Sequence, residues 1–286
     1  MLSNKMRILV ISLSLIFTIK LNSQPILTDS LKEVDYLKIG IISGVTAGAF
    51  VYGHAIQNDM WWKGEKSDFK FNWREDWEYA LGSDKLGHFF FPYMASKIYT
   101  GLFIDAGLKK RESQYISASL LFLYQTYVEI RDGFSKEWGF SWGDFTANLA
   151  GSIYPILKEE IDPESTFLLK VSYYPSERFK NNSNRYIIDD YESTYYWLTI
   201  NIDNFLKEQS KGFWTKFINL SIGYSVKNLD FADKYPEFYL SIDFNLKAIE
   251  WDFPLWQIIQ EIFTYYKLPA PAIRISPGFT GFMLKF

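Results

Sequence analysis

The spacing of hydrophobic and polar positions divides the chain into two halves. Up to about residue 162, long apolar stretches carry polar residues three or four positions apart, which is typical of helices. We expect helices over residues 37–56, 83–108, 113–131 and 141–160, with a short helix near 74–81. After Pro163 the period changes to two, which predicts strands. The expected strands are 167–174, 195–202, 218–226 and 238–246.

The end of the chain predicts one more helix and a hairpin. The helix is expected over 254–268, and the hairpin joins 271–276 to 279–286 at Pro277-Gly278, because proline and glycine favour tight turns. The pattern therefore predicts the α+β class: an N-terminal bundle of about four short apolar helices, then a mainly antiparallel β region with one helix. We expect a helical domain over 34–162 and a β-rich domain over 163–286.

The first residues have the layout of an export signal. Lys5 and Arg7 precede an apolar run over 8–19, and polar residues follow. This order is typical of a secretory signal peptide, and the run is too short to span a bilayer comfortably. We predict a signal peptide over 1–23 and a protein in the periplasm or associated with the outer membrane. An uncleaved anchor and a buried N-terminal helix are the alternatives.

The amino-acid composition excludes several classes of protein. With 48% hydrophobic and 22% charged residues, the chain can form a core and is not disordered. The 30 basic and 33 acidic residues give a net charge of −3, so no basic excess exists to bind nucleic acid. Aromatic residues make up 19% of the chain, a content that suits a membrane interface. The chain has no cysteine, which excludes disulfides and thiolate metal sites and predicts that the protein is not a lipoprotein.

A stripe of glycines marks the first apolar segment. Gly40, Gly44 and Gly48 fall on one helix face, which suits either packed membrane helices or a tightly packed soluble helix. If the apolar segments crossed the inner membrane, the basic cluster at 109–111 would lie outside, against the positive-inside rule. We therefore expect a helical domain that folds after export, either soluble or lying against a membrane.

Three of the predicted helices each carry a polar pair in an apolar background. Asp84 and His88 lie four apart beside Lys85, and Glu129 and Asp132 lie three apart. The third pair is Asp144 and Asn148. Residues at these spacings share a helix face. Buried charges require partners, so inward-facing pairs predict one shared polar network.

Each of these residues also has a structural explanation. Asp84 in a first helical turn is favourable through the helix dipole. Asp144 can complete a capping box with Ser141, and Arg131 can pair with a carboxylate of a neighbouring helix. His54 is the second histidine of the chain. It could approach the same site, but it is expected at a solvent-facing helix end.

The order of these motifs resembles the YfiM-like family of predicted periplasmic lipoproteins, a family of unknown function, and more distantly the VanZ-like proteins. The matching residues are Asp84, Lys85, Gly87, His88, Glu129, Asp132, Gly133, Gly139, Phe140, Ser141, Asp144, Ala147, Asn148 and Gly151. The segment 190–192 ahead of 195–198 also resembles a C-terminal extension of longer Bacteroidetes-type members. The resemblance implies a periplasmic location and a shared site without an established reaction. The missing lipid-attachment cysteine departs from the family.

Two functions compete. The first is a non-enzymatic, membrane-associated envelope protein, in which Asp84, Lys85, Arg131, Ser141 and Asn148 form a structural or binding network. A lipid surface is its expected partner, and an envelope protein is another. The second is a metal-assisted hydrolase of an envelope lipid or glycan, with catalytic candidates His88, Glu129, Asp132 and Asp144.

One histidine among carboxylates suits Mg²⁺, Ca²⁺ or Mn²⁺ better than zinc, although the sequence requires no cofactor. A third hypothesis is a small transmembrane barrel in the β half, but about six strands are fewer than the eight of the smallest usual barrels.

Overall fold

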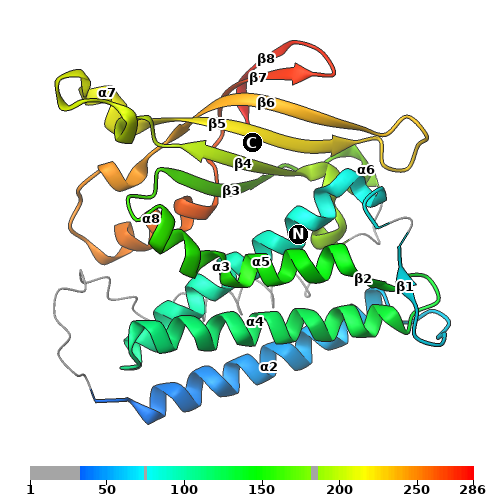
Figure 1. The fold of residues 1–286 in the computed structure, drawn as a ribbon. Helices are drawn as coiled ribbons and strands as arrows, with labels where there is room; N and C mark the ends of the chain where they lie inside the picture. Colours follow the sequence, from blue (N-terminus) through cyan, green and yellow to red (C-terminus); the bar gives the residue numbers. More distant parts are fainter. Residues whose placement is uncertain (1–32, 74–75, 182–185) are drawn as a thin grey trace.

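The computed structural model describes residues 33–73, 76–181 and 186–286, so the expected signal peptide lies outside the described residues. A layer of long helices lies beneath a twisted antiparallel sheet (Figure 1). The described residues form seven α-helices and two sheets, the larger of six strands. The predicted α+β class is confirmed.

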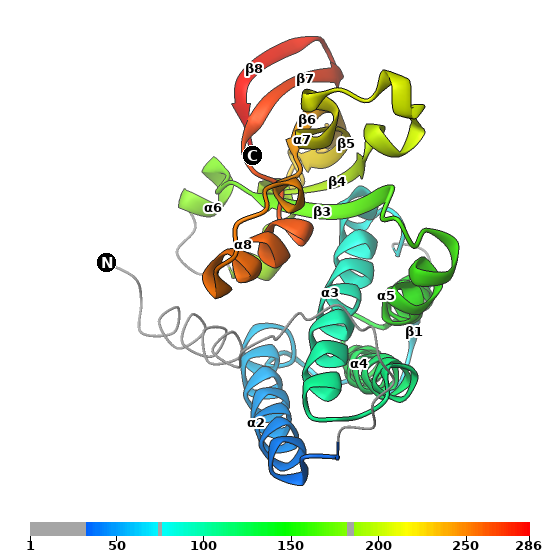
Figure 2. The same ribbon diagram turned by 90° about the vertical axis from the view of Figure 1, so that its left-hand side faces the viewer.

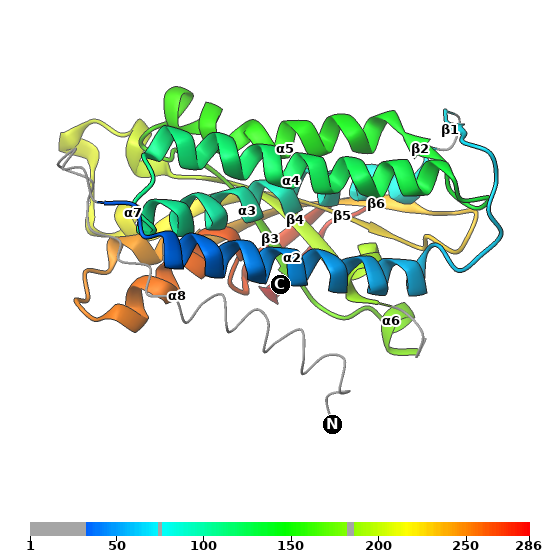
Figure 3. The ribbon, with the colours of Figure 1, turned by 90° about the horizontal axis from the view of Figure 1, so that it is seen from below.

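The helical layer consists of four long helices. They are α2 (Tyr36–Met60), α3 (Ser83–Asp105), α4 (Lys110–Gly133) and α5 (Trp142–Ile161). Each boundary lies within four residues of its predicted position. The helices α3, α4 and α5 pack on one another, and α2 runs alongside α3 and α4 (Figure 3). Ile42 of α2 packs with Leu102 and Phe103 of α3.

Close approach of α3 and α5 depends on one glycine. A Cβ atom on Gly151 would lie 2.0 Å from the carbonyl oxygen of Phe89. The absence of a side chain therefore lets the two backbones touch. In contrast, a Cβ atom on Gly40, Gly44 or Gly48 would have no atom of the protein within 4 Å, so this stripe of α2 packs on nothing within the described chain.

The segment between α2 and α3 differs from the prediction of a helix near 74–81. A 3₁₀ helix, η1 (Tyr79–Gly82), precedes α3 directly, and residues 74–75 are not described. Two short parallel strands, β1 (Phe71–Asn72) and β2 (Phe140–Ser141), tie this segment to the start of α5. Strand pairing thus holds the start of this segment, and of its described residues only the last ones before α3 are helical.

The larger sheet has the strand order of the sequence, and every neighbouring pair is antiparallel. Its strands are β3 (Phe167–Tyr173), β4 (Thr194–Ile200), β5 (Ile218–Lys227), β6 (Tyr235–Phe244), β7 (Ala270–Ser276) and β8 (Thr280–Lys285). The predicted hairpin at Pro277-Gly278 is the β7–β8 connection. The helices of this half are α6 (Glu177–Asn181), α7 (Phe213–Phe217) and α8 (Pro254–Tyr265). Short 3₁₀ helices are η2 (Ile187–Asp189), η3 (Tyr191–Ser193), η4 (Ile202–Phe205), η5 (Glu208–Ser210) and η6 (Leu246–Ala248).

The helix α8 ends earlier than predicted because the next residues join the sheet. Tyr266 forms a parallel bridge with Val171 of β3, and the amide of Lys267 donates to the Val171 carbonyl at 2.9 Å. The segment after α8 thereby leads from β3, at one edge of the sheet, to β7, next to the strand at the other edge. In Figure 2 the sheet curls over α8 and α3.

An aromatic core joins the two halves. Phe90 and Tyr93 of α3 pack with Tyr265 of α8, and Val171 and Tyr196 of the sheet pack around them. Tyr93 and Tyr265 meet edge to face, with ring centroids 5.5 Å apart. This core places α3 between the sheet and the rest of the helical layer, so the polar face of α3 is positioned by both halves.

Candidate functional site

The three polar pairs lie on neighbouring helices that face one another. The structure brings together seven side chains, which we call the polar cluster: Asp76, Asp84, Lys85, His88, Glu129, Asp144 and Asn148. All of these residues are buried except His88, whose side chain is 23% exposed. The cluster therefore belongs to the interior of the helical layer and reaches solvent through His88.

Lys85 lies at the centre of the acidic side chains. Its ammonium is 2.7 Å from Asp76 Oδ1, 3.0 Å from Asp84 Oδ2 and 2.7 Å from Asp144 Oδ1. Three buried carboxylates thus share one cation, which compensates the cost of removing them from water. Burial would lower the pKa of Lys85, but the carboxylates of Asp84 and Asp144 outweigh it and hold the pKa above its usual value.

Ser141 and Asp76 hold the start of α5. The Ser141 hydroxyl accepts a hydrogen bond from the Asp144 amide at 2.8 Å, as expected of an N-cap. The second half of the predicted capping box is not formed. The Asp144 carboxylate turns to Lys85, and the Ser141 amide donates to Glu129 Oε2 at 3.3 Å. The Gly143 amide donates to Asp76 Oδ2 at 3.0 Å, so Asp76 also satisfies the helix end.

His88 connects the acidic residues of all three helices. Its Nε2 lies 3.6 Å from Asp84 Oδ1, and its Nδ1 lies 3.6 Å from Glu129 Oε1. Nδ1 is also 3.2 Å from Asn148 Oδ1. Burial would lower the pKa of His88, but the carboxylates of Asp144 and Asp84 raise it to about 9. The imidazole is therefore a cation at neutral pH.

Glu129 is the most deeply buried acid of the cluster. It is 1% exposed, and its Oε1 has no hydrogen-bond partner. Burial raises the pKa of Glu129 well above its ordinary value. Gln125, one turn earlier on α4, donates to Asn148 Oδ1 at 3.0 Å, so α4 and α5 are joined by an amide contact beside the acid.

Asp132, Arg131 and His54 contact Trp62 or Tyr127 rather than the side chains of the polar cluster, although the charges of the cluster act on Asp132. Asp132 accepts a hydrogen bond from Trp62 Nε1 at 2.6 Å, and burial raises its pKa to about 7. The Arg131 guanidinium lies over the Trp62 ring, 4.7 Å from its centroid, and forms no ion pair with a described carboxylate. His54 contacts the Tyr127 hydroxyl at 2.7 Å. These residues form a second polar group around Trp62.

Sequence reasoning missed three partners of the site. Asp76 lies in an aromatic segment with no periodicity to mark it. Gln125 precedes Glu129 by four residues, and this helical spacing could have found it. The third partner is Tyr191 of η3, whose hydroxyl donates to Asp84 Oδ1 at 2.7 Å. Tyr191 belongs to the segment 190–192 that the sequence singled out, but pairing across 107 residues has no local signal.

The titration of His88 predicts a pH dependence of stability. Its folded-state pKa lies above the value near 6.5 of an unfolded chain, so the folded protein binds this proton more tightly. The contribution is fully present below about pH 6.5 and is lost as pH rises through about 9. We expect it to reach roughly 2 kcal/mol, because the shift is large and the imidazole is only partly exposed.

Denaturant unfolding of the wild type and of His88→Gln at several pH values from 6 to 10 measures this contribution. The stability of His88→Gln should fall less than that of the wild type over this range. Burial also lowers the pKa values of Lys267 and Lys285 to about 8, so the difference between the two proteins is the quantity to compare. Parallel curves would contradict the assigned proton.

Three residues of the cluster could hold a metal ion. Ligand atoms of Asp84, His88 and Asp144 all lie within 4.8 Å of one another. Two carboxylates and one imidazole suit a divalent cation that prefers oxygen ligands. The Lys85 ammonium already lies beside both carboxylates, so a metal ion would have to share them with this cation.

The comparison with known proteins agrees with the location of the site. Residues 72–160 match the model of a family described as predicted periplasmic lipoprotein (DUF2279). The matched segment contains every residue of the polar cluster. The similarity supports a periplasmic protein. No curated protein and no solved structure matches the chain.

The family description corrects one prediction. The missing cysteine predicts that the protein is not a lipoprotein, whereas the matching family is described as predicted periplasmic lipoprotein. The prediction rested on a single residue type, because the chain has no cysteine. That absence excludes only a lipid carried by a cysteine of this sequence, and it was too narrow a basis for the prediction. The predicted periplasmic location agrees with the family.

Proposed function

We propose that this is a membrane-associated envelope protein whose helical layer contacts lipid and whose polar cluster is a structural core. The observation that carries the proposal is the inverted polarity of the helices. On α4 and α5 the buried faces are rich in polar side chains and the exposed faces carry large apolar ones, the reverse of a helix surrounded by water. In lipid this arrangement is the favourable one.

Helix α4 has the clearest inversion. Its buried face includes Ser117, Gln125 and Glu129. Its exposed large hydrophobic residues are Tyr115, Ile116, Leu123, Tyr127 and Ile130. Helix α5 repeats the pattern, with Asp144, Asn148 and Ser152 buried. Its exposed large hydrophobic residues are Trp142, Leu149, Ile153, Leu157 and Ile161.

Helix α2 supports the same conclusion by its length and composition. It has 25 residues, its most apolar 18-residue window has a mean hydropathy of 1.5, and 11% of that window is buried in the protein. Exposed Leu37, Ile41, Val45 and Val51 lie along it. It is long and apolar enough to cross a membrane, and lipid would cover the surface that the protein leaves open.

The polar cluster supports a structural role. Lys85 pairs with one acid from the segment before α3, one from α3 and one from α5. The Asp84–Tyr191 hydrogen bond joins α3 to the β half. Such a network holds apolar helices in one arrangement where hydrophobic burial between them is weak. The order of the motifs also supports kinship with YfiM-like and VanZ-like proteins.

Single-cysteine labelling tests the proposed contact with lipid. The chain has no cysteine, so Ile116→Cys on α4 and Ile153→Cys on α5 can each carry one environment-sensitive fluorophore. In vesicles, lipids brominated on their acyl chains should quench both labels, because the labels face hydrocarbon. Lys136→Cys, on an exposed loop, is the matched control and should not be quenched. Equal, weak quenching of all three labels would overturn the proposal.

A second candidate is the metal-assisted hydrolase, favoured by one observation. Asp84, His88 and Asp144 present ligand atoms within 4.8 Å of one another, and Glu129 Oε1 lacks a hydrogen bond beside them. Mn²⁺ titration followed by calorimetry tests this function. Stoichiometric binding that is lost in His88→Ala would support a metal centre, and absence of binding to the wild type would remove it.

A further inference from the structure

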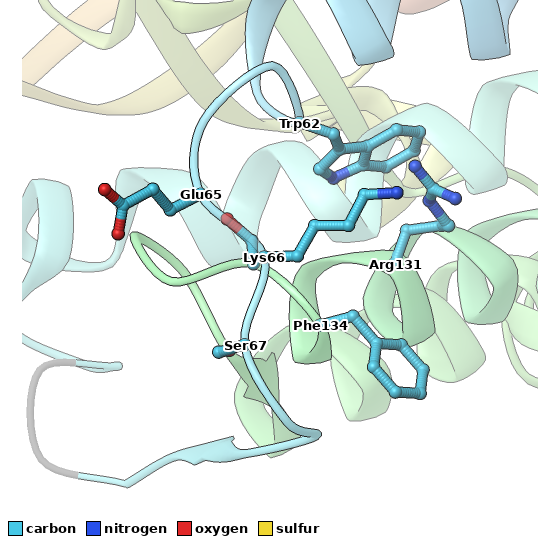
Figure 4. A pocket seen from close by; sticks show the side chains of 7 residues that line it. Trp62, Glu65, Lys66, Ser67, Arg131 and Phe134 are labelled. Atoms are coloured by element: carbon cyan, nitrogen blue, oxygen red, sulfur yellow. The ribbon is translucent and has the colours of Figure 1, made fainter.

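Two cavities lie near Trp62, one at the C-terminal ends of α2 and α4 and one further back along the same two helices. One has a volume of about 260 Å³ and is lined by Trp62, Lys66, Arg131 and Phe134, together with Glu65, Ser67 and Ser135 (Figure 4). We call it the cationic cavity. Its wall is fixed by backbone hydrogen bonds, in which the Ser67 amide donates to the Phe134 carbonyl at 3.0 Å. The wall of the cavity is therefore a fixed part of the fold.

The two cations of this cavity lack acidic partners. Among the described residues, neither Arg131 nor Lys66 forms an ion pair. Figure 4 shows the Lys66 side chain extending towards Trp62 and Arg131, whereas the Glu65 side chain points the other way. Glu65 pairs with Lys136 instead. Two positive charges therefore face one cavity, which favours an anionic ligand.

The second cavity is an apolar groove between α2 and α4. It has a volume of about 410 Å³ and is lined by Phe50, Val51, His54, Leu123, Tyr124 and Tyr127. Trp62 of the cationic cavity contacts two residues that line the groove. The Trp62 ring centroid lies 5.6 Å from that of His54 and 6.2 Å from that of Tyr127. An apolar surface and a pair of cations thus meet at one tryptophan.

We propose that these two cavities form one binding site for an anionic phospholipid. Arg131 and Lys66 bind the phosphate group, and Trp62 contacts the glycerol region. The apolar groove takes part of an acyl chain. A guanidinium presents paired N–H donors that match phosphate oxygens, and the groove supplies the apolar contact that a free phosphate ion does not use.

The position along α2 favours a lipid as the source of the phosphate. At 1.5 Å per residue, the 25 residues of α2 span about 37 Å, somewhat more than the hydrocarbon core of a bilayer. Trp61 and Trp62 follow directly after the end of α2, where tryptophans and phospholipid head groups share the interface. This choice of source rests on the membrane association proposed above, whereas binding of phosphate by the two cations does not.

Calorimetric titration of the full chain in a non-ionic detergent tests the site. The probes are inorganic phosphate, a short-chain phosphatidic acid and the corresponding phosphatidylcholine. We expect the phosphatidic acid to bind about tenfold more tightly than phosphatidylcholine, because phosphatidic acid has a net negative charge whereas the choline cation leaves phosphatidylcholine with none. Equal affinity for phosphate and phosphatidic acid would overturn the groove as an acyl-chain site. Absence of binding by all probes would overturn the whole proposal.

Three variants separate the parts of the site. Arg131→Gln and Lys66→Gln should each weaken phosphatidic acid and phosphate binding about tenfold, since each removes one charge-assisted contact. Lys109→Gln, at the opposite end of α4, is the control and should bind as the wild type, because Lys109 is exposed and lines neither cavity. Lys66 is exposed, so its replacement leaves the fold intact. Unchanged binding by both test variants would overturn the assignment of the cations.

A separate variant tests the role of the groove. Leu123→Glu places a charge among apolar groove residues. It should weaken phosphatidic acid binding about tenfold while phosphate binding stays unchanged. Equal loss of both ligands would contradict separate roles for the cavity and the groove. If labels on α4 and α5 are not quenched by lipid but phosphatidic acid still binds, membrane insertion fails and the lipid site stands.

Discussion

Replacing Lys85 with methionine is expected to lower the free energy of unfolding by about 3–5 kcal/mol. The substitution keeps most of the apolar stem but removes the cation shared by Asp76, Asp84 and Asp144. The carboxylates would then lie close together without compensation, in a site where burial already opposes their charge. Chemical denaturation followed by far-UV circular dichroism measures the loss.

Lys136→Met is the control for this substitution. Lys136 also pairs with an acid, but both side chains of the pair are exposed, so the change should cost less than about 1 kcal/mol. A loss from Lys85→Met no larger than that of the control would contradict a structural role for the polar cluster.

Gly151→Ala is expected to destabilise the protein by about 3 kcal/mol. The added Cβ would lie 2.0 Å from the Phe89 carbonyl oxygen and 2.8 Å from its carbonyl carbon. Backbone atoms cannot rotate away as a side chain can, so α3 and α5 would have to separate. That movement would also pull Asp84 and Lys85 away from Asp144.

A glycine-to-alanine substitution on α2 should have the opposite effect on stability. Gly44 has no atom of the protein within 4 Å of an added Cβ, and alanine is a better helix former than glycine. Gly44→Ala should therefore stabilise α2 by about 0.5–1 kcal/mol. Thermal unfolding of the two variants in the same detergent compares them. If both substitutions destabilise equally, the close α3–α5 contact is not the cause.

Most elements of the fold could be predicted from periodicity. The change of period after Pro163 separates helices from strands, and the Pro277-Gly278 turn located the final hairpin. The end of α8 could not be predicted, because Tyr266 leaves the helix to pair with β3. Likewise, the segment before α3 is held by β1 and β2, and pairing with a distant strand leaves no mark on local sequence.

Part of the candidate site could be predicted from the sequence. Helical spacing identified Asp84, His88, Glu129 and Asp144, which the structure places on facing helices. Spacing could not identify Asp76, because its partners Ser141 and Gly143 are distant in the sequence. It also could not separate Asp132 from the cluster, because position on a helix does not decide which neighbour a side chain meets. In this chain Asp132 accepts a hydrogen bond from Trp62 Nε1.

The bridge between Val171 and Tyr266 sets an order of events during folding. The two residues lie far apart in the sequence, so the curved sheet cannot close before nearly the whole chain is available, and such distant pairing is slow. An exported chain that emerges from its N-terminus would therefore assemble the helices first. The last twenty or so residues would act as the closing step, and a protein truncated before Tyr266 would lack β7 and β8 and leave β6 with an unpaired edge that is prone to aggregation.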